Sequence, residues 1–442
     1  MSLPGLIEIV PPQGGCEARV RVPGSKSITN RALMLAALAR GPVTLLGALW
    51  SEDTQVMSEA LKVLGFQVRV EDDPGETCNR IIHVHGCGGG IPNGGTTANP
   101  LELKVGNAGT AARFLSALVC LGQGAYRLVG VPRMHERPQG GLFGALRQLG
   151  YEVKADQGGE CLPVMILGKG LNGAHGAVCR VDIRQSSQFA SALLMAGKAG
   201  GWKVTVQGED AEESPYVAMT TRMMKVFPWD GGVFEVEPDA SSGSYFWGAR
   251  WLLNRGSSGG GITVEGWPVS GWQMDAAFPQ VGLRLENGHF AGMPRQLSRV
   301  KDLGDSIMTA IVLAPYNREE VVFQDLGRLR LQECERVKAL KTELSRCGAR
   351  VEEVGDTLKV RPAKAGELHG AEVETYGDHR MAMCFALFGL GTPGIRIRNP
   401  ACVNKTFPNF FQKLAGPAPG GLGVGLLDEK GQQPEFKDLF AG

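Results

Sequence analysis

LKVLGFQVRV, residues 61 to 70, has the pattern of a helix end, a glycine turn and the beginning of a strand. A glycine just beyond a helix can adopt the left-handed conformation that ends it, and the alternating residues that follow are typical of a strand. The same pattern returns as LRQLGYEVKA at 146–155 and as LSRCGARVEE at 344–353. This recurrence predicts an α/β protein built from internal repeats.

A second repeat consists of short turns rich in Gly, Ser, Asn or Asp, each placed before an apolar run. The pairs are PGSKS before ALMLAALA, GNAGT before AARFLSALVCL, RQSSQ before FASALLMAG, PDASS before YFWGARWLL, KDLGDS before IMTAIVLA, and YGDHR before MAMCFALFGL. Helices that are apolar on nearly all faces are buried. Ordinary N-capping explains any one of these turns. As a set, six helix N-termini converging on one cleft would favour a polyanionic ligand.

Three of these helix units precede Pro238–Asp239 and three follow it, which predicts two similar halves with a domain change near that point. A chain of 442 residues is long enough for two or three domains. Lys and Arg number 46 against 45 Asp and Glu, a net charge of +1, which disfavours nucleic-acid and membrane-surface proteins. Any anionic ligand must therefore be met by a local cluster of cations.

The cysteines and the apolar runs indicate the compartment. Ten cysteines are scattered without CxxC pairs, so we expect reduced thiols, no zinc site and a cytoplasmic protein. The start, MSLPGLIEIVPPQGG, lacks the basic and apolar regions of a signal peptide. The longest apolar runs, such as MAMCFALFGL at 381–390, are too short to span a bilayer.

The first turn, PGSKS, places Lys26 and Ser27 at the start of a helix, and Arg31 follows four residues after Ser27 on the same face. A phosphate or a carboxylate would suit such an end. Taken alone, Lys26 would more often be a solvated surface lysine. The sequence GxxxxGK[ST] does not occur, which disfavours nucleotide hydrolysis.

Later turns carry comparable groups, each with an ordinary structural alternative. In GNAGT, Asn107 accompanies Gly109, where the missing side chain would let a ligand approach the backbone. Asp305 could be merely an N-cap, and Glu333 in QECER would pass as part of a salt-bridged helix face. His379 is a capping histidine or a substrate contact, with neither interpretation favoured.

Nine short motifs in one order resemble the signature set of the 5-enolpyruvylshikimate-3-phosphate (EPSP) synthase family. They are PGSKSxxNRA, GNAGTAxRF, PRMxERP, SSQFxxALLMA, PYVxMT, DASSxSYF, DxxMT, DHRMAM and NKTFPxFF, and they run from Val22 to about Leu414. The resemblance implies transfer of the enolpyruvyl group of phosphoenolpyruvate to the 5-hydroxyl of shikimate 3-phosphate. It implies addition and elimination through a tetrahedral intermediate, with neither a metal nor an organic cofactor.

The fold implied by the resemblance is α/β, with two similar domains, each made of three βαβαββ-type repeats with buried helices, an inside-out α/β barrel. The first domain would comprise residues 1–22 and 239–442, and the second residues 23–238, with the active site in a cleft that closes about the two crossings. We expect a cytoplasmic monomer whose partners are phosphoenolpyruvate and shikimate 3-phosphate, with no nucleic-acid or membrane partner.

The resemblance also implies the site residues. Shikimate 3-phosphate would be bound by Lys26, Ser27, Arg31, Ser186, Ser187, Gln188 and Tyr216. Phosphoenolpyruvate would be held by Arg137, Arg336, Arg380 and Lys405 with the backbone around Gly109, and Asn107 and Asp305 would also contact substrate. Asp305 would take the proton of the 5-hydroxyl and Glu333 would handle the carbon proton, with Lys26 and Lys405 as candidate partners. No metal ligands are implied.

Three residues depart from the family pattern. Gln332 stands where the family usually has a lysine, which should weaken binding of the shikimate ligand unless Arg328 or Arg330 substitutes. Glu213 stands where the family usually has a phosphate-binding serine. A carboxylate there would repel phosphate unless Ser214 binds the phosphate instead.

The third departure is Phe114, which replaces a common proline and leaves the glyphosate sensitivity expected of the family open. These departures leave an alternative function open, namely a divergent enolpyruvyl transferase or a binding protein for another phosphorylated alcohol. A transferase acting on UDP-N-acetylglucosamine is disfavoured, because SKSITNR replaces its usual lysine–asparagine pair.

Overall fold

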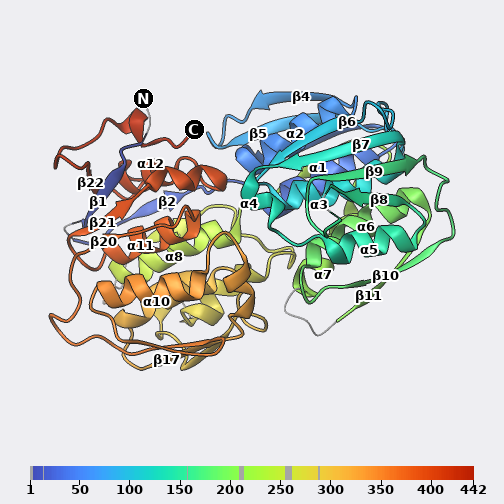
Figure 1. Cartoon of the computed structure of the whole chain (residues 1–442). Helices are drawn as coiled ribbons and strands as arrows, with labels where there is room; N and C mark the ends of the chain where they lie inside the picture. Colours follow the sequence, from blue (N-terminus) through green and yellow to red (C-terminus); the bar gives the residue numbers. More distant parts are fainter. Residues whose placement is uncertain (1–2, 13, 157, 209–213, 254–260, 287–288) are drawn as a thin grey trace. The chain divides into compact units, whose positions relative to one another are not determined.

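The structure is a computed structural model that describes residues 3–12, 14–156, 158–208, 214–253, 261–286 and 289–442 (Figure 1). The chain divides into two compact units. Unit 1 comprises Met1–Pro23 and Pro238–Gly442, and unit 2 comprises Gly24–Glu237. The expected domain cleft stays a prediction.

Within the described residues, four four-stranded sheets share one pattern, in which the first two strands are parallel and the other neighbours are antiparallel. Unit 2 holds β12 (Gly232–Glu235), β3 (Pro42–Leu49), β5 (Asn79–His85) and β4 (Gln67–Asp72), and then β6 (Leu101–Gly106), β7 (Gln123–Gly130), β9 (Val164–Lys169) and β8 (Glu152–Ala155). Unit 1 holds β16 (Gln296–Ser298), β17 (Val321–Gln324), β19 (Thr357–Val360) and β18 (Val351–Val354), and then β20 (Glu372–Val373), β21 (Ile395–Arg398), β1 (Leu6–Val10) and β22 (Gly425–Leu427).

Each unit also has a parallel two-stranded pair. This pair is β10 (Val178–Asp182) with β11 (Lys203–Gln207) in unit 2, and β2 (Ala18–Val20) with β13 (Ile262–Val264) in unit 1. A short hairpin in unit 1 joins β14 (Leu285–Glu286) to β15 (His289–Phe290). The recurring strand order explains why the same sequence pattern returns along the chain.

The helices of unit 2 are α1 (Lys26–Leu38), α2 (Glu52–Val63), α3 (Gly109–Leu118), α4 (Pro132–His135), α5 (Gly140–Gln148), α6 (Ser187–Gly200) and α7 (Ser214–Val226). Those of unit 1 are α8 (Ala240–Leu253), α9 (Ile307–Leu313), α10 (Arg336–Arg346), α11 (His379–Gly389) and α12 (Phe410–Ala415). Short helical turns are η1 (Val119–Leu121), η2 (Met274–Ala277), η3 (Phe278–Gly282), η4 (Ala314–Tyr316), η5 (Gly327–Leu331), η6 (Pro400–Lys405) and η7 (Phe436–Leu439).

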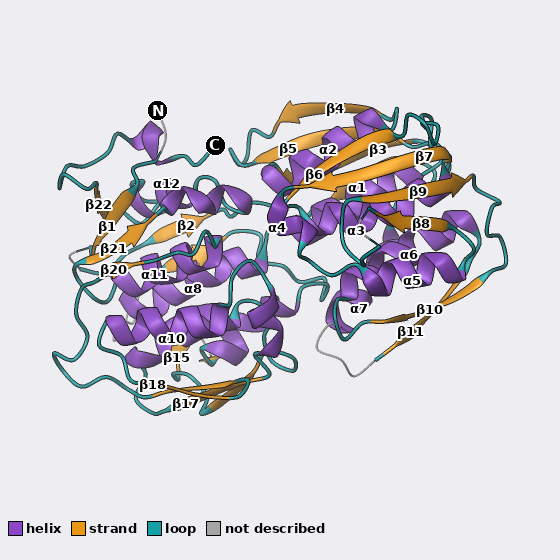
Figure 2. Ribbon diagram, viewed as in Figure 1, coloured by secondary structure: helices purple, strands orange, loops and turns teal. Residues whose placement is uncertain are grey.

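The helices form the core of each unit, and the sheets cover them (Figure 2). All ten residues of α3 are buried, and so are all residues of α1 from Ile28 onward. Strands such as β18 and β21 instead alternate between more and less buried residues, so that one face packs inward. Six helices begin at the six predicted turns, which confirms the prediction of buried helices.

The glycines of the repeated helix–turn–strand pattern adopt the predicted conformation. Gly65, Gly150 and Gly348 have φ angles of 91°, 86° and 86°, in the left-handed region that favours glycine. Each follows its helix at the point where the chain turns into the next strand. The local pattern therefore predicted both the element types and the turn between them.

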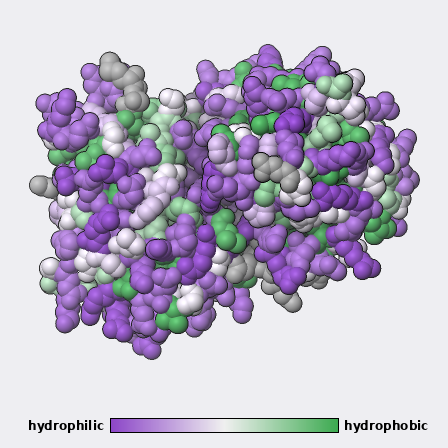
Figure 3. Space-filling model, viewed as in Figure 1, coloured by the Kyte–Doolittle hydropathy of each residue, from purple (hydrophilic) through white to green (hydrophobic). Residues whose placement is uncertain are grey.

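Hydrophobic residues on the face shown in Figure 3 form small scattered patches among hydrophilic ones. Among the described residues, none of the helices combines the length and the apolar character that crossing a membrane requires. All ten cysteines have free thiols, and six of them are buried.

Candidate active-site residues

The turn before α1 is packed tightly inside unit 2. The backbone N–H of Gly24 donates to Asn79 Oδ1 at 2.8 Å, and a Cβ at Gly24 would lie 2.0 Å from the carbonyl oxygen of Gly47. The backbone N–H of Ser25 donates to the carbonyl of Glu237 at 2.8 Å, and the Ser25 side chain makes no capping bond. The helix end is therefore placed by tertiary packing and not by a serine cap.

Lys26, the first residue of α1, is held by a buried carboxylate. Its Nζ lies 3.1 Å from Asp53 Oδ2 at the start of α2, and the Lys26 side chain is 19% exposed. Ser27 follows, with its carbonyl accepting a hydrogen bond from Arg31 Nη1 at 2.9 Å. Lys26 and Ser27 thus occupy the partly open first turn of an otherwise buried helix.

Arg31 is buried and joins three helices. Its Nε donates to Thr220 Oγ1 on α7 at 2.7 Å, and its Nη2 donates to Ser191 Oγ on α6 at 3.2 Å. The guanidinium carbon lies 5.4 Å from the ring centroid of Phe114 on α3. Hydroxyls and an aromatic ring hold this arginine in place while leaving it cationic.

Two guanidinium groups flank Gly109 at the N-terminus of α3. A Cβ at Gly109 would lie 2.6 Å from Arg137 Nη2 and 2.8 Å from Arg113 Nη1. Arg137 donates to the carbonyl of Asn107 at 3.2 Å, and Arg113 donates to Gln188 Oε1 at 2.7 Å. Positive side chains beside exposed helix N–H groups form an anion-binding arrangement.

The start of α6 supplies the other polar groups of unit 2. The side chain of Ser186 caps α6 by accepting from the backbone N–H of Gln188 at 3.3 Å, and Ser187 is buried beside it. Gln188 Nε2 donates to Thr110 Oγ1 at 3.2 Å. Tyr216 lies on α7, where its carbonyl accepts from Thr220, the hydroxyl that also binds Arg31.

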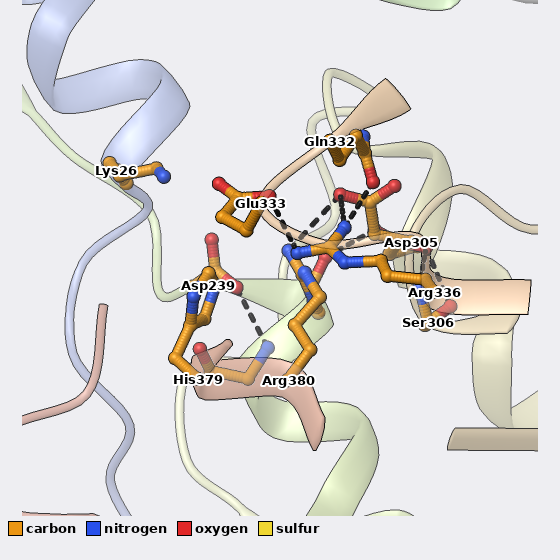
Figure 4. A network of polar contacts seen from close by, with 12 residues as sticks. Lys26, Asp239, Asp305, Ser306, Gln332, Glu333, Arg336, His379 and Arg380 are labelled. Atoms are coloured by element: carbon orange, nitrogen blue, oxygen red, sulfur yellow. Dashed lines mark hydrogen bonds and ion pairs between the residues drawn. The ribbon is translucent and has the colours of Figure 1, made fainter. Parts of the chain in front are cut away.

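The corresponding group in unit 1 is centred on Arg336, the first residue of α10 (Figure 4). Its side chain is 1% exposed, and it forms ion pairs with Asp378 at 2.6 Å and Glu333 at 2.8 Å. Asp378 also caps α11, because its carboxylate accepts from the backbone N–H of Arg380 at 2.9 Å. One buried carboxylate therefore connects the beginnings of two helices.

Asp305 lies in the turn before α9 and faces three guanidinium groups. Its carboxylate is 3.1 Å from Arg299 Nη2, 3.4 Å from Arg380 Nη2 and 3.8 Å from Arg336 Nη1. Burial by itself would raise the pKa of Asp305, but the positive charges of these arginines, Arg380 most of all, hold it well below its usual range. Asp305 is therefore an ionised carboxylate at neutral pH.

Glu333 completes this group. One carboxylate oxygen receives Arg336 at 2.8 Å, and the other lies 3.4 Å from Nζ of Lys405 at the end of η6. Lys405 is 10% and Glu333 15% exposed at the side chain. Unit 1 thus brings together five of the predicted site residues, namely Asp305, Glu333, Arg336, Arg380 and Lys405.

Comparison with known proteins shows the family. The family model described as EPSP synthase (3-phosphoshikimate 1-carboxyvinyltransferase) matches residues 10–230 and 228–414. A 3-phosphoshikimate 1-carboxyvinyltransferase from Trichormus variabilis is 38% identical over 428 residues, covering 90% of this chain and 96% of the relative. One from Pseudomonas savastanoi pv. phaseolicola is 39% identical over 432 residues, covering 92% and 97%. The chain belongs to the EPSP synthase family.

Solved structures agree on the fold. An EPSP synthase from Acinetobacter baumannii superposes with a TM-score of 0.73 at 22% identity, covering 95% of this chain and 99% of that one. The enolpyruvyl transferase NikO from Streptomyces tendae superposes with a TM-score of 0.67 at 16% identity, covering 96% and 98%. The predicted fold class is thereby confirmed.

Two of the three departures from the EPSP synthase pattern acquire a structural context. Gln332 Oε1 accepts a hydrogen bond from Arg336 Nη1. Arg330, one of the two arginines expected to substitute for the lysine, pairs with Glu335 at 2.8 Å, Glu353 at 2.9 Å and Asp356 at 2.9 Å. Phe114 is buried beneath the guanidinium of Arg31. Glu213 lies outside the described residues.

Sequence reasoning missed two parts of the unit 1 group. Arg299, which is 2% exposed and bonded to Asp305, was not singled out, although it lies only six residues before that carboxylate. Asp378, in the turn YGDHR, was assigned no role from the sequence. The structure shows that Asp378 itself caps α11, while His379 is buried. A buried Arg–Asp pair separated by 42 residues leaves no local signal.

Proposed function

We propose that this member of the EPSP synthase family transfers the enolpyruvyl group of phosphoenolpyruvate to the 5-hydroxyl of shikimate 3-phosphate, releasing phosphate. The observation that carries the proposal is the carboxylate pair Asp305 and Glu333 within a cluster of buried cations. The reaction needs one proton removed from an alcohol and one delivered to carbon, and it needs cations to hold anionic substrates. The names of the curated relatives support the same reaction.

In the proposed mechanism, Asp305 takes the proton of the 5-hydroxyl while the hydroxyl oxygen bonds to C2 of phosphoenolpyruvate. Glu333, between Arg336 and Lys405, delivers a proton to C3 from its protonated form, and C3 becomes a methyl group. In the second step a methyl proton returns to Glu333, the C2–C3 double bond re-forms, the C2–O bond to phosphate breaks, and the proton held by Asp305 leaves with the phosphate. The low pKa of Asp305 keeps it ionised at neutral pH, which is the form that can accept a proton.

The proposed substrate contacts come from both units. Shikimate 3-phosphate would be bound by Lys26, Ser27, Arg31, Ser186, Ser187, Gln188 and Tyr216. Phosphoenolpyruvate would be held by Asn107, Gly109, Arg137, Arg336, Arg380 and Lys405. Arginine suits this work because its planar fork meets a phosphate or a carboxylate with two hydrogen bonds.

The test is phosphate release from phosphoenolpyruvate, measured with and without shikimate 3-phosphate. We expect release that depends on the acceptor and that collapses in Asp305→Asn and in Lys26→Ala. Lys62→Ala is the matched control, because Lys62 is an exposed lysine whose ammonium pairs with Glu59. A folded protein that releases no phosphate would overturn the proposal, and its acceptor would then be sought among other phosphorylated alcohols.

We further propose that the enzyme works as a cytoplasmic monomer without a metal ion. The ten free thiols are consistent with a reducing compartment. Dialysis against a chelator should leave turnover unchanged, and light scattering should give the mass of a single chain, 47.1 kDa. Loss of turnover that added divalent metal restores would contradict the metal-free mechanism.

A further inference from the structure

The turn that carries Asp305 is held by a buried carboxylate that the proposed chemistry does not use. Asp275, in η2, is only 6% exposed. Its Oδ1 accepts hydrogen bonds from the backbone N–H of Ser306 at 3.0 Å and from the Ser306 hydroxyl at 2.5 Å. Its Oδ2 accepts from the hydroxyl of Ser241 on α8. Three donors thus converge on one carboxylate directly beside Asp305.

The residue on the other side of Asp305 is also packed against Asp275. A Cβ at Gly304 would lie 3.1 Å from both carboxylate oxygens of Asp275, closer than side chains normally approach. The turn therefore contacts Asp275 both before and after Asp305. Fixing both neighbours of a residue limits the directions in which its side chain can point.

Asp275 is itself anchored on the beginning of α8. Gln273, two residues before Asp275, accepts from the backbone N–H of Ala240 at 2.9 Å and donates to the carbonyl of Pro238 at 2.8 Å. The indole N–H of Trp267 donates to the carbonyl of Ala276 at 3.0 Å. A side chain held this firmly can transmit its own placement to the turn that it binds.

We infer that Asp275 is a positioning residue, which fixes the Gly304–Ser306 turn against α8 and so keeps the Asp305 carboxylate on Arg299, Arg336 and Arg380. The inference rests on the proposed function, in which Asp305 is the base. Asp275 takes no part in proton transfer, because its oxygens are occupied by the two serines. Its effect on turnover should therefore pass entirely through Asp305.

The first test is Asp275→Ala. We expect kcat to fall by about 10²-fold, the typical cost of misplacing a catalytic group by about 1 Å, with KM for both substrates changed less than about threefold. Asp275→Asn, which keeps an acceptor for Ser306, should recover most of this loss. Ser244→Ala is the matched control, because Ser244 is a buried serine on α8 whose hydroxyl bonds to Ser241 O and Thr309. An unchanged kcat in Asp275→Ala would overturn the inference.

A double-mutant cycle separates positioning from general stability. In an Asp305→Asn background, Asp275→Ala should lower the residual rate by less than about threefold, because the group that it positions is already gone. A merely structural role would lower the rate equally in both backgrounds, which would overturn the inference. If Asp275→Ala does not fold, Ser306→Ala removes one hydroxyl while keeping the buried carboxylate. It should lower kcat by about tenfold, and an unchanged kcat would count against the inference.

A crystal structure of the Asp275 variant keeps this test apart from that of the proposed function. A wild-type protein that shows no acceptor-dependent phosphate release would contradict the proposed function but not the positioning role of Asp275. In the variant we expect Asp305 Oδ1 to move about 1 Å or more from its place at Arg299, whatever the reaction. An Asp305 carboxylate still 3.1 Å from Arg299, as in the native chain, would overturn the positioning role.

Discussion

The buried arginines of the two units are held by different kinds of acceptor. In unit 2, the hydrogen bonds described above run from Arg31 to hydroxyls and a carbonyl, and from Arg113 to an amide oxygen. In unit 1, Arg336 donates to two carboxylates, and Arg299 faces a third. Neutral acceptors orient a cation without cancelling its charge, whereas carboxylates cancel it and are ionised in return.

This difference fits the division of labour in the proposed reaction. A cation held by hydroxyls keeps its attraction for an incoming phosphate, and unit 2 supplies most contacts proposed for shikimate 3-phosphate. A carboxylate surrounded by guanidinium groups stays ionised and fixed in place, and unit 1 supplies the proposed acid and base. We therefore expect substitutions in unit 1 to act mainly on kcat, and substitutions in unit 2 to act mainly on substrate affinity.

The largest effect is expected for Glu333→Gln. Loss of the carboxylate removes the proposed proton donor to carbon, so kcat should fall by about 10²- to 10⁴-fold. Binding of shikimate 3-phosphate, measured by calorimetry, should stay within about threefold of wild type if unit 2 supplies most of the affinity. Glu335→Gln, two residues away in the same segment, is the control. A variant that loses binding but keeps kcat would break the comparison.

The next effect is expected for Gly109→Ala in unit 2. The new Cβ would displace the ends of Arg137 and Arg113, and both are flexible side chains that can move without unfolding the chain. Losing one charge-assisted hydrogen bond of about 1.5–3 kcal/mol raises KM for phosphoenolpyruvate about 10- to 150-fold. Gly144→Ala on α5, where a Cβ meets nothing within 4 Å, should change neither kinetic constant. Equal effects of the two substitutions would contradict the role of the two arginines.

Arg299→Gln should change the pH profile more than the rate at neutral pH. Removing a cation destabilises the ionised form of Asp305, so the pKa of this carboxyl rises and the acidic limb of kcat moves to higher pH. The low native pKa stabilises the fold above the unfolded value of about 4, and this stability is lost as pH falls through the folded pKa.

In the Arg299→Gln variant this loss still begins near the unfolded pKa of about 4, but it ends at a higher pH and is smaller in total, which urea unfolding from about pH 5 downward would detect. The control is Arg295→Gln, because Arg295 is an exposed arginine that pairs with Glu319. If the acidic limb stays where it is in wild type, Arg299 does not tune Asp305.

The smallest effect is expected for Gln332→Lys. A lysine at this position adds one positive contact to the proposed shikimate ligand, which should tighten its binding by about 3- to 10-fold, or roughly 1 kcal/mol. Arg330→Gln should leave binding unchanged, because Arg330 is committed to three carboxylates. Calorimetry with shikimate 3-phosphate measures both. Weaker binding in Gln332→Lys would show that the native amide is the better partner.

The parts of the fold that were predicted correctly depend on local patterns. A glycine after a helix and a run of apolar residues each report on a few neighbouring positions, and Gly65, Gly150 and Gly348 adopt the expected left-handed conformation. The cap of α1 was not predictable in this way. The backbone of Ser25 bonds to Glu237, more than two hundred residues away, and this tertiary contact leaves the serine side chain without a capping bond.

The candidate site was predicted through motifs, and its physical arrangement was not. The resemblance named Asp305, Glu333 and Arg336, and the structure brings these three together in unit 1. Arg299 and Asp275 carry no motif of their own, although both contact the turn in which the DxxMT motif begins. Supporting residues of this kind become visible only once the packing around Asp305 is known.

The inside-out arrangement of each unit has a consequence for amide hydrogen exchange. In many α/β proteins the central strands exchange most slowly, because the sheet lies between layers of helices. Here α1, α3 and α11 are buried almost throughout, and β4 and β18 have no fully buried residue. The slowest-exchanging amides should therefore lie in the helices, so that deuterium enters this molecule through its sheets.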